Sequence, residues 1–150
     1  MNYMKQAEFY IEVSSTPLQA SGQDKVEFFL NTNVGEKRIA LKEGASGGEL
    51  ARVLLSLHIL LAGKEKVGTL VFDEIDANIG GTTAAIMGEK LQLLGKSLQI
   101  ISITHFPQVA KYADHHLKIS KNTLNGRTLS QINYLKDRRE ELARMSGNMV

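Results

Sequence analysis

Three acidic side chains come directly after a short apolar run in this sequence. Asp73, Glu74 and Asp76 follow residues 69–72, which read Thr-Leu-Val-Phe. The run has no polar alternation, so it predicts a β-strand buried on both faces. Parallel sheets bind ligands at the carboxyl ends of such strands. An aspartate there can hold a Mg²⁺ hydration shell, and the next glutamate can orient or deprotonate a water molecule. The alternative that these acids are merely solvated stays open on this motif alone.

A second candidate site is the segment Ser46-Gly47-Gly48-Glu49. The apolar residues beyond it have helical spacing and predict a helix that runs to about Ala62: Leu50, Val53, Leu54, Leu57 and Leu61. Ser46 and Glu49 have the spacing of a capping box, which is a purely structural explanation. Capping does not require Gly47 and Gly48, because each glycine in a helix costs about 1 kcal/mol relative to alanine. A helix start without side chains leaves its amide groups open to an anion, so the sequence favours phosphate contact over capping alone.

A histidine follows the next apolar run along the chain. Residues 98–104 predict a second buried strand, and residues 82–94 between the two strands predict a helix. A strand–helix–strand crossover of this length predicts a right-handed parallel unit. His105 is therefore expected at the same sheet edge as Asp73 and Glu74. A lone histidine at a strand end is usually a capping or packing residue, and here a ligand-facing role is equally favoured.

One segment imitates a phosphate-binding loop. Gly95-Lys96-Ser97 matches the end of the motif, but the motif needs a glycine where the chain has Lys90. The context is also reversed, because these residues are expected to close a helix and open a strand. We therefore predict no P-loop in this sequence.

The flanking segments predict further strands. Residues 7–13 and 25–32 predict an antiparallel pair joined by a turn region at residues 14–23. Residues 114–121 and 127–135 predict a second pair. The connection in this second pair is Asn125-Gly126, a strong hairpin signal because both residues tolerate positive φ. A charged helix is expected over residues 136–145.

Composition bounds the classes of function. The chain has 150 residues, 43% of them hydrophobic and 23% charged, which is ordinary for a soluble globular domain. It lacks an apolar run of membrane-spanning length and an apolar segment behind its first residues, so neither a transmembrane helix nor a signal peptide is predicted. The absence of cysteine excludes disulfides and thiolate metal sites and fits a reducing compartment. A net charge of +2 is too small to demonstrate nucleic-acid binding.

In their order and spacing, three motifs resemble those of ABC-type ATPase heads of the SMC-like branch, and most closely those of the bacterial RecN family of DNA repair proteins. Residues 45–52 resemble the ABC signature motif, residues 69–76 resemble the Walker B strand and D-loop, and residues 104–110 resemble the switch-histidine loop. The resemblance covers residues 7–145. It implies an α/β fold, the C-terminal lobe of an ABC/SMC-type P-loop NTPase head, with a parallel sheet flanked by helices and a C-terminal β-hairpin. Residues 1–150 would then be a single domain, the C-terminal half of the head.

The resemblance also implies a role for each candidate residue. Asp73 would bind Mg²⁺ through its water shell, and Glu74 would act on the attacking water. His105 would contact the γ-phosphate of ATP, and Asp76 would couple two heads across their interface. The signature residues would bind a nucleotide held mainly by the second head, and they are Ser46, Gly47, Gly48 and Glu49.

Several partners are implied by the same resemblance. In the family, the P-loop and Q-loop lie in an N-terminal lobe, which coiled-coil arms separate from the C-terminal lobe. We expect neither that lobe nor the arms within this sequence. We therefore expect the chain alone to bind ATP weakly and to hydrolyse it negligibly. Its implied partners are the N-terminal P-loop lobe of the same protein, a second head in a homodimer, and DNA, with no membrane. The implied process is double-strand break repair and recombination, in the cytoplasm at the nucleoid.

Two other functions remain open. The chain could be a non-enzymatic docking or dimerisation module, or a head fragment of another SMC-like or ABC protein. A transporter subunit would carry its P-loop upstream of the signature within one globular domain, and 45 residues precede Ser46 here.

Overall fold

The computed structural model falls into two compact units, Met1–Leu50 and Ala51–Val150, each described by itself below. The structure describes residues 8–31, 37–44, 46–61, 64, 67–124 and 126–147. Several residues of the predicted elements and motifs lie outside this described part, and they are Ala7, Thr32, Ala45, Ala62 and Asn125. None of the helices in the described part is long and apolar enough to cross a membrane.

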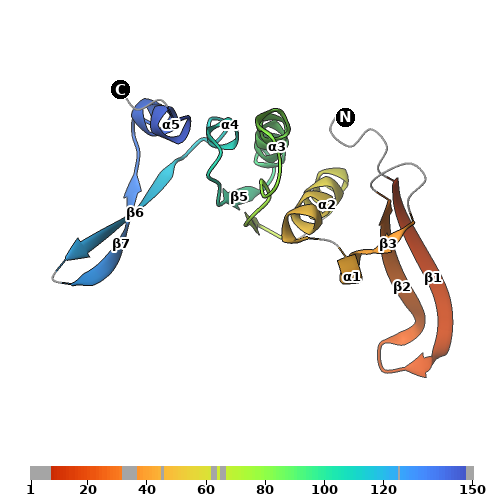
Figure 1. The fold of residues 1–150 in the computed structure, drawn as a ribbon. Coiled ribbons are helices and arrows are strands. Elements are labelled where there is room, and N and C mark those ends of the chain that lie inside the picture. Colours follow the sequence, from red (N-terminus) through yellow and green to blue (C-terminus); the bar gives the residue numbers. More distant parts are fainter. Residues whose placement is uncertain are drawn as a thin grey trace. The chain divides into compact units, whose positions relative to one another are not determined.

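The first unit is an antiparallel sheet with the strand order β1-β2-β3 (Figure 1). Its strands are β1 (Glu8–Gln19), β2 (Gly22–Asn31) and β3 (Ile39–Ala40). The register sets apolar side chains of β1 opposite apolar side chains of β2, in the pairs Phe9–Leu30, Ile11–Phe28 and Val13–Val26. Because side chains alternate along a strand, these pairs share one face of the sheet. The predicted antiparallel pair is therefore confirmed.

The predicted turn region at residues 14–23 is too long. The strand β1 continues to Gln19, and the turn consists of Ala20 and Ser21. Pro17 lies inside the strand, where the pairing with β2 becomes irregular between Ser15 and Gln19. A proline is tolerated there because β1 is at the edge of the sheet and the regular ladder is interrupted. A short helix, α1 (Leu41–Gly44), follows β3 and was not predicted.

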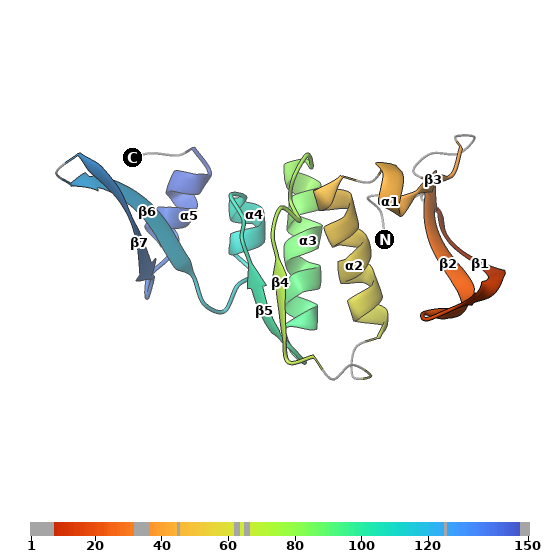
Figure 2. The ribbon, with the colours of Figure 1, turned by 90° about the horizontal axis from the view of Figure 1, so that it is seen from below.

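The helix α2 (Gly47–Leu60) confirms the predicted helix. The second unit continues with β4 (Thr69–Phe72), α3 (Gly81–Leu94), β5 (Gln99–Ser102) and the short α4 (Pro107–Ala110). The strands β4 and β5 pair in parallel, with Phe72 opposite Ser102, as predicted. The helix α3 lies beside both strands in Figure 1 and Figure 2 and supplies buried side chains from one face: Ala84, Met87, Leu91 and Leu94.

The prediction that β4 is buried on both faces is wrong for this chain. Phe72 is 2% exposed, whereas Val71 is 62% exposed. The neighbouring strand repeats this asymmetry, because Ile101 is 47% exposed and Ile103, just beyond β5, is 51% exposed. Successive side chains of a strand point to opposite faces. In the described part of the chain, one face of the parallel pair is covered and the other presents apolar side chains to solvent.

The chain ends in the predicted hairpin and helix. The strands β6 (Leu117–Leu124) and β7 (Arg127–Tyr134) pair antiparallel, and Gly126 in the turn has φ +74°, which favours glycine. The last helix, α5 (Arg139–Met145), begins three residues later than predicted. It is joined to β6 by an ion pair of 2.5 Å between Lys118 Nζ and Glu141 Oε2.

Candidate functional site at the strand ends

The parallel pair brings the predicted site residues to one edge of the sheet. Asp73 and Glu74 directly follow β4, and His105 follows the extension of β5. The ladder continues beyond the strands, because the N–H of Ile103 donates to the carbonyl of Phe72 at 2.9 Å. Parallel strands in register end at the same edge. The expected placement of the histidine beside the acids is thus confirmed.

The backbone at the acids is unusual. Glu74 has φ +56° and Asn78 has φ +58°, both in the left-handed region that non-glycine residues rarely adopt. A turn begins at Glu74 and ends just before Asn78, since the N–H of Ala77 donates to the carbonyl of Glu74 at 2.9 Å. Such strained residues cluster at active sites and ligand clamps. The strain is thus located in the segment that carries the exposed carboxylate of Glu74.

Asp73 fits the requirements of a magnesium ligand. Its side chain is exposed, and its Oδ1 accepts the N–H of Glu74 at 2.9 Å, which fixes the carboxylate against the backbone. An ionised carboxylate retains further acceptor sites. Among the described residues, no group of three or more His, Asp or Glu side chains could hold a metal ion. Magnesium does not need such a group, because it keeps several waters and takes one or two carboxylates together with substrate phosphates.

Asp76 lies beneath the histidine rather than in solvent. Its side chain is 3% exposed, and its Oδ1 is 3.9 Å from Nδ1 of His105, which is itself 76% exposed. The hydroxyl of Thr104 donates to the other carboxylate oxygen, Oδ2. A buried carboxylate is stable where hydrogen bonds and a potential cation compensate for lost hydration. The structure therefore brings Asp76 and His105 together, and Thr104, which directly precedes His105, bonds to the carboxylate of Asp76.

Two further residues shape this site and were not assigned a role from the sequence. Arg52, on α2, donates through one guanidinium nitrogen to the carbonyls of Ile75 and Ala77, at 3.2 Å each. These carbonyls flank Asp76 on both sides. Thr104 is the second such residue. Both contacts join segments more than 20 residues apart, so no local pattern in the sequence could have indicated them.

The start of α2 forms the capping box that the sequence offered as a structural explanation. The N–H of Ser46 donates to Oε2 of Glu49 at 2.9 Å, and the N–H of Glu49 donates to Oγ of Ser46 at 3.3 Å. These two bonds satisfy two backbone donors. The remaining amides at a helix start have no partner within the helix, and here two of them belong to Gly47 and Gly48. Capping and an anion site are thus compatible at this helix start.

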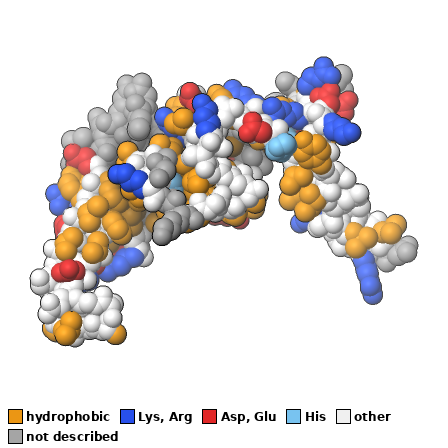
Figure 3. Space-filling view, turned by 180° about the vertical axis from the view of Figure 1, so that it is seen from behind, with side chains coloured by type: hydrophobic (Ala, Val, Ile, Leu, Met, Phe, Trp, Pro, Cys, Tyr) orange, Lys and Arg blue, Asp and Glu red, His pale blue; other side chains and the backbone are white. Residues whose placement is uncertain are grey.

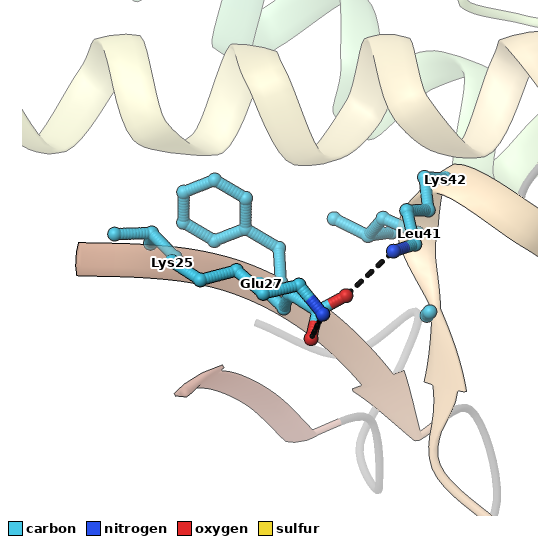
Figure 4. A pocket seen from close by; sticks show the side chains of 7 residues that line it. Lys25, Glu27, Leu41 and Lys42 are labelled. Carbon is cyan, nitrogen blue, oxygen red and sulfur yellow. Dashed lines mark hydrogen bonds and ion pairs between the residues drawn. The ribbon is translucent and has the colours of Figure 1, made fainter. Parts of the chain in front are cut away.

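A separate pocket in the first unit offers less chemistry. It has a volume of about 190 Å³ and lies between β2 and the α1 segment (Figure 4). Lys25 and Lys42 both pair with Glu27, at 2.8 and 2.5 Å, and their hydrogen bonds lower the pKa of its carboxyl. The charged groups of this pocket therefore satisfy one another. The strand-end cluster remains the better candidate site.

Comparison with curated proteins finds related sequences, although no family model matches the chain. The chain is 38% identical to the DNA repair protein RecN of Halalkalibacterium halodurans over 150 residues, which are 95% of this chain and 26% of the relative. It is 43% identical to RecN of Xylella fastidiosa over 131 residues, covering 86% of this chain and 24% of the relative. It is 40% identical to RecN of Vibrio cholerae over 148 residues, which are 96% of this chain and 27% of the relative. The chain thus spans about a quarter of the length of these relatives.

Solved structures with the same fold are head domains of SMC proteins. The Smc head domain with a coiled coil and joint from Pyrococcus yayanosii has a TM-score of 0.71 and 19% identity, and the match covers 96% of this chain and 26% of that chain. The Smc head domain from Pyrococcus furiosus, bound to the C-terminal domain of ScpA, has a TM-score of 0.63 and 20% identity. This match covers 95% of this chain and 34% of that chain. These likenesses confirm the predicted fold: a mixed α/β head with a parallel sheet and antiparallel hairpins.

Proposed function

Because this chain is homologous to RecN DNA repair proteins over most of its length and has the fold of SMC heads, we propose that it forms one part of an SMC-like ATPase head that acts in DNA repair. The observation that carries this proposal is the parallel register of β4 and β5, which sets two carboxylates and a histidine at one sheet edge. That edge is where this class of sheet binds nucleotides.

Each residue at the edge has a proposed task in ATP hydrolysis. Asp73 would hold Mg²⁺ through its water shell, and the ion would supply positive charge at the phosphates. Glu74 orients the attacking water and takes its proton. His105 donates a hydrogen bond to the γ-phosphate. Their exposure supports these tasks, because all three side chains are open to a ligand in the described structure.

The start of α2 is proposed to serve a second nucleotide. Gly47 is exposed and presents its backbone amide, Gly48 behind it is buried, and Ser46 and Glu49 hold the helix start in place. In this proposal the segment contacts the γ-phosphate of ATP held by another head, so that two copies form a dimer around nucleotide. A similar structure supports it: a protein described by ATP-driven dimerisation and DNA-stimulated activation of SMC ATPases has a TM-score of 0.56 and 17% identity to this chain, covering 83% of that chain.

Exposed apolar faces support the proposal that another lobe completes the head. On the parallel pair these residues are Val71, Ile101 and Ile103, and on the hairpin they are Leu117, Ile119, Ile132 and Tyr134, each between 47% and 64% exposed. The four hairpin residues occupy two opposed pairs of the register and so share one face, and Figure 3 shows hydrophobic side chains at the surface of this hairpin. Contiguous exposed apolar surface marks an interaction site. We propose that the P-loop lobe of the same protein covers these faces.

The wider biological role follows as part of the same proposal. The head is proposed to work in repair of DNA double-strand breaks by recombination, in the cytoplasm at the nucleoid, with DNA as a partner of the assembled protein. A non-enzymatic docking module would use the same apolar faces without any need for the strand-end acids. Removing one acid therefore distinguishes the two functions.

The test compares Glu74→Gln with Glu89→Gln, an exposed position on α3, each mixed with the P-loop lobe of the same protein and DNA. We expect Glu74→Gln to lower ATP turnover by a factor of roughly 10²–10⁴ and to preserve ATP binding, because general-base catalysis contributes about that much. Glu89→Gln should behave as the unmodified chain. Association without any ATP turnover would favour the docking module, and turnover that is indifferent to Glu74→Gln would contradict the role proposed for Glu74.

A further inference from the structure

The strand-end site contains a buried carboxylate to which the proposed hydrolysis assigns no contact with ATP. Asp76 is 2% exposed and lies within 3.9 Å of the imidazole of His105. We propose that Asp76 and Thr104 are positioning residues that set the orientation and tautomer of His105. This inference rests on the proposed role of His105 toward the γ-phosphate, and it names the groups that prepare the histidine for that role.

Thr104 ties Asp76 to the loop that carries the histidine. Its hydroxyl donates a hydrogen bond to Oδ2 of Asp76, and Oγ1 of Thr104 itself accepts the N–H of Phe106 at 3.0 Å. A hydroxyl has one proton to donate, and the carboxylate oxygen lies nearer to it than the carbonyl oxygen of Phe106 at 3.5 Å, so the proton is directed toward Asp76. The side chain of Thr104 therefore holds both the carboxylate of Asp76 and the backbone of Phe106, the residue after His105.

The backbone of Asp76 is fixed as well. The guanidinium of Arg52 holds the carbonyls of Ile75 and Ala77, which precede and follow the aspartate. The other oxygen of the carboxylate, Oδ1, remains directed toward Nδ1 of His105 at 3.9 Å. This separation is longer than a hydrogen bond, and such contacts at catalytic sites often tighten when the substrate binds. A carboxylate fixed from both sides is suited to hold an imidazole that is itself 76% exposed.

The arrangement decides which ring nitrogen meets the nucleotide. The negative charge of a carboxylate beside Nδ1 favours the tautomer with a proton on Nδ1, as second partners of functional histidines commonly do. Nε2, on the opposite side of the ring, is then the nitrogen available to a ligand. In an imidazolium both ring nitrogens are donors, so Nε2–H can donate a hydrogen bond to a phosphate oxygen while Nδ1–H faces Asp76. The ring of Phe106, whose centroid is 4.4 Å from that of His105, limits tilting of the imidazole.

The first test measures the ring nitrogens of His105 by ¹⁵N NMR in the full chain without nucleotide, at about pH 8, where an ordinary imidazole is neutral. We expect the Nδ1–H tautomer in the unmodified chain. In Asp76→Asn, the Thr104 hydroxyl engages the amide oxygen and leaves the amide NH₂ facing Nδ1, so the tautomer should change to Nε2–H. Asp114→Asn, at an exposed position, is the matched control and should change nothing.

Variants of Thr104 separate positioning from folding. Thr104→Val keeps the side-chain volume and loses the hydroxyl, so it should weaken the Nδ1–H preference; Thr104→Ser keeps the hydroxyl and should restore it. Urea unfolding of each variant reports the structural cost independently. Variants that lose stability but keep the tautomer of the unmodified chain would overturn the proposal, as would an Nε2–H tautomer in the unmodified chain.

The second test uses ATP turnover by the head completed with its P-loop lobe. We expect Asp76→Asn and His105→Ala each to lower kcat by about tenfold or more with little change in KM, and the double variant to lose no more than His105→Ala alone. Additive losses would contradict positioning through the histidine. The NMR result does not depend on ATP, so a failed proposal of ATPase function and a failed positioning proposal give different outcomes.

Discussion

Glu74 combines an exposed carboxylate with a backbone conformation that its residue type disfavours. At φ +56° its Cβ crowds the neighbouring carbonyl, which costs about 1–2 kcal/mol relative to glycine. The conformation of Glu74, which is proposed to act on water, thus lowers the stability of the fold, as backbone strain at functional sites often does.

This strain gives a prediction that is independent of ATP. Glu74→Gly should raise the free energy of unfolding by about 1 kcal/mol, because glycine adopts positive φ without the steric cost, although it loses more entropy on folding. Glu74→Gln keeps the Cβ and should change stability by less than about 0.5 kcal/mol. Urea denaturation of both variants measures the difference. A glycine variant less stable than the glutamine variant would show that the conformation is not strained.

At the same scale, the sequence was informative where chemistry follows directly from chain position. The placement of Asp73, Glu74 and His105 followed from two apolar runs in one parallel unit, and the structure confirms it. The partners of Asp76 could not be predicted, because Thr104 and Arg52 reach it through tertiary contacts over 28 residues and, via the flanking carbonyls, 23 and 25 residues.

Between elements, α3 and α4 meet at a glycine. A Cβ added to Gly88 would lie 2.5 Å from Cδ2 of Tyr112, 3.0 Å from Cα of Val109 and 3.1 Å from the carbonyl oxygen of Gln108. The last two atoms are backbone and cannot yield by a side-chain rotation. The helices α3 and α4 can therefore approach each other this closely because residue 88 is a glycine and has no side chain.

Gly88→Ala should therefore destabilise the second unit by roughly 1–3 kcal/mol, the usual cost of overpacking, even though alanine is the better helix former. Gly68→Ala is the matched control, because a Cβ there meets nothing within 4 Å. Thermal unfolding should show a lower Tm for Gly88→Ala alone. Equal Tm values for the two variants would mean that the helices can separate without cost.

The last helix is anchored by a buried acid. Glu141 is 7% exposed, and its hydrogen bonds with Arg144, followed by those with Lys118 of β6, lower the pKa of its carboxyl to about 2. The folded pKa lies below the ordinary value of 4.5, so the contribution to stability is complete above about pH 4.5 and is lost as the pH falls toward 2.

Glu141→Gln should accordingly lower the free energy of unfolding by roughly 1–3 kcal/mol at neutral pH, the range for hydrogen bonds to charged groups. The difference from the unmodified chain should shrink as the pH falls through the window from 4.5 to about 2. Glu140→Gln, at an exposed position on the same helix, serves as control. A difference that stays constant across this window would show that the ion pairs do not anchor α5.

Elements were predicted better in type than in extent. The parallel unit, both hairpins and α2 were expected from periodicity and turn residues, and they are present. The length of β1 was missed because Pro17 reads as a turn residue and is accommodated at an irregular edge. The burial of β4 was overestimated because an apolar side chain such as Val71 predicts that its face of the strand is covered. In the described part of the chain, one face of β4 is covered and the face of Val71 is exposed.

For the whole molecule, the apolar faces and the strand-end site point to the same conclusion. The chain spans about a quarter of its RecN relatives, with 26% coverage in one case. It leaves Val71 and Ile101 on the sheet and Ile119 and Ile132 on the hairpin exposed, and its sequence contains no P-loop. A head part that lacks the main phosphate-binding amides would need a second lobe both to bury its surface and to hold ATP.

The most direct measurement of this account is ATP hydrolysis by the 150-residue chain alone, by the P-loop lobe of the same protein alone, and by an equimolar mixture of the two, with and without DNA. The account predicts negligible turnover by either part, and association with DNA-stimulated turnover in the mixture. Robust turnover by the isolated chain that Glu74→Gln abolishes, or a mixture whose parts do not associate, would contradict it.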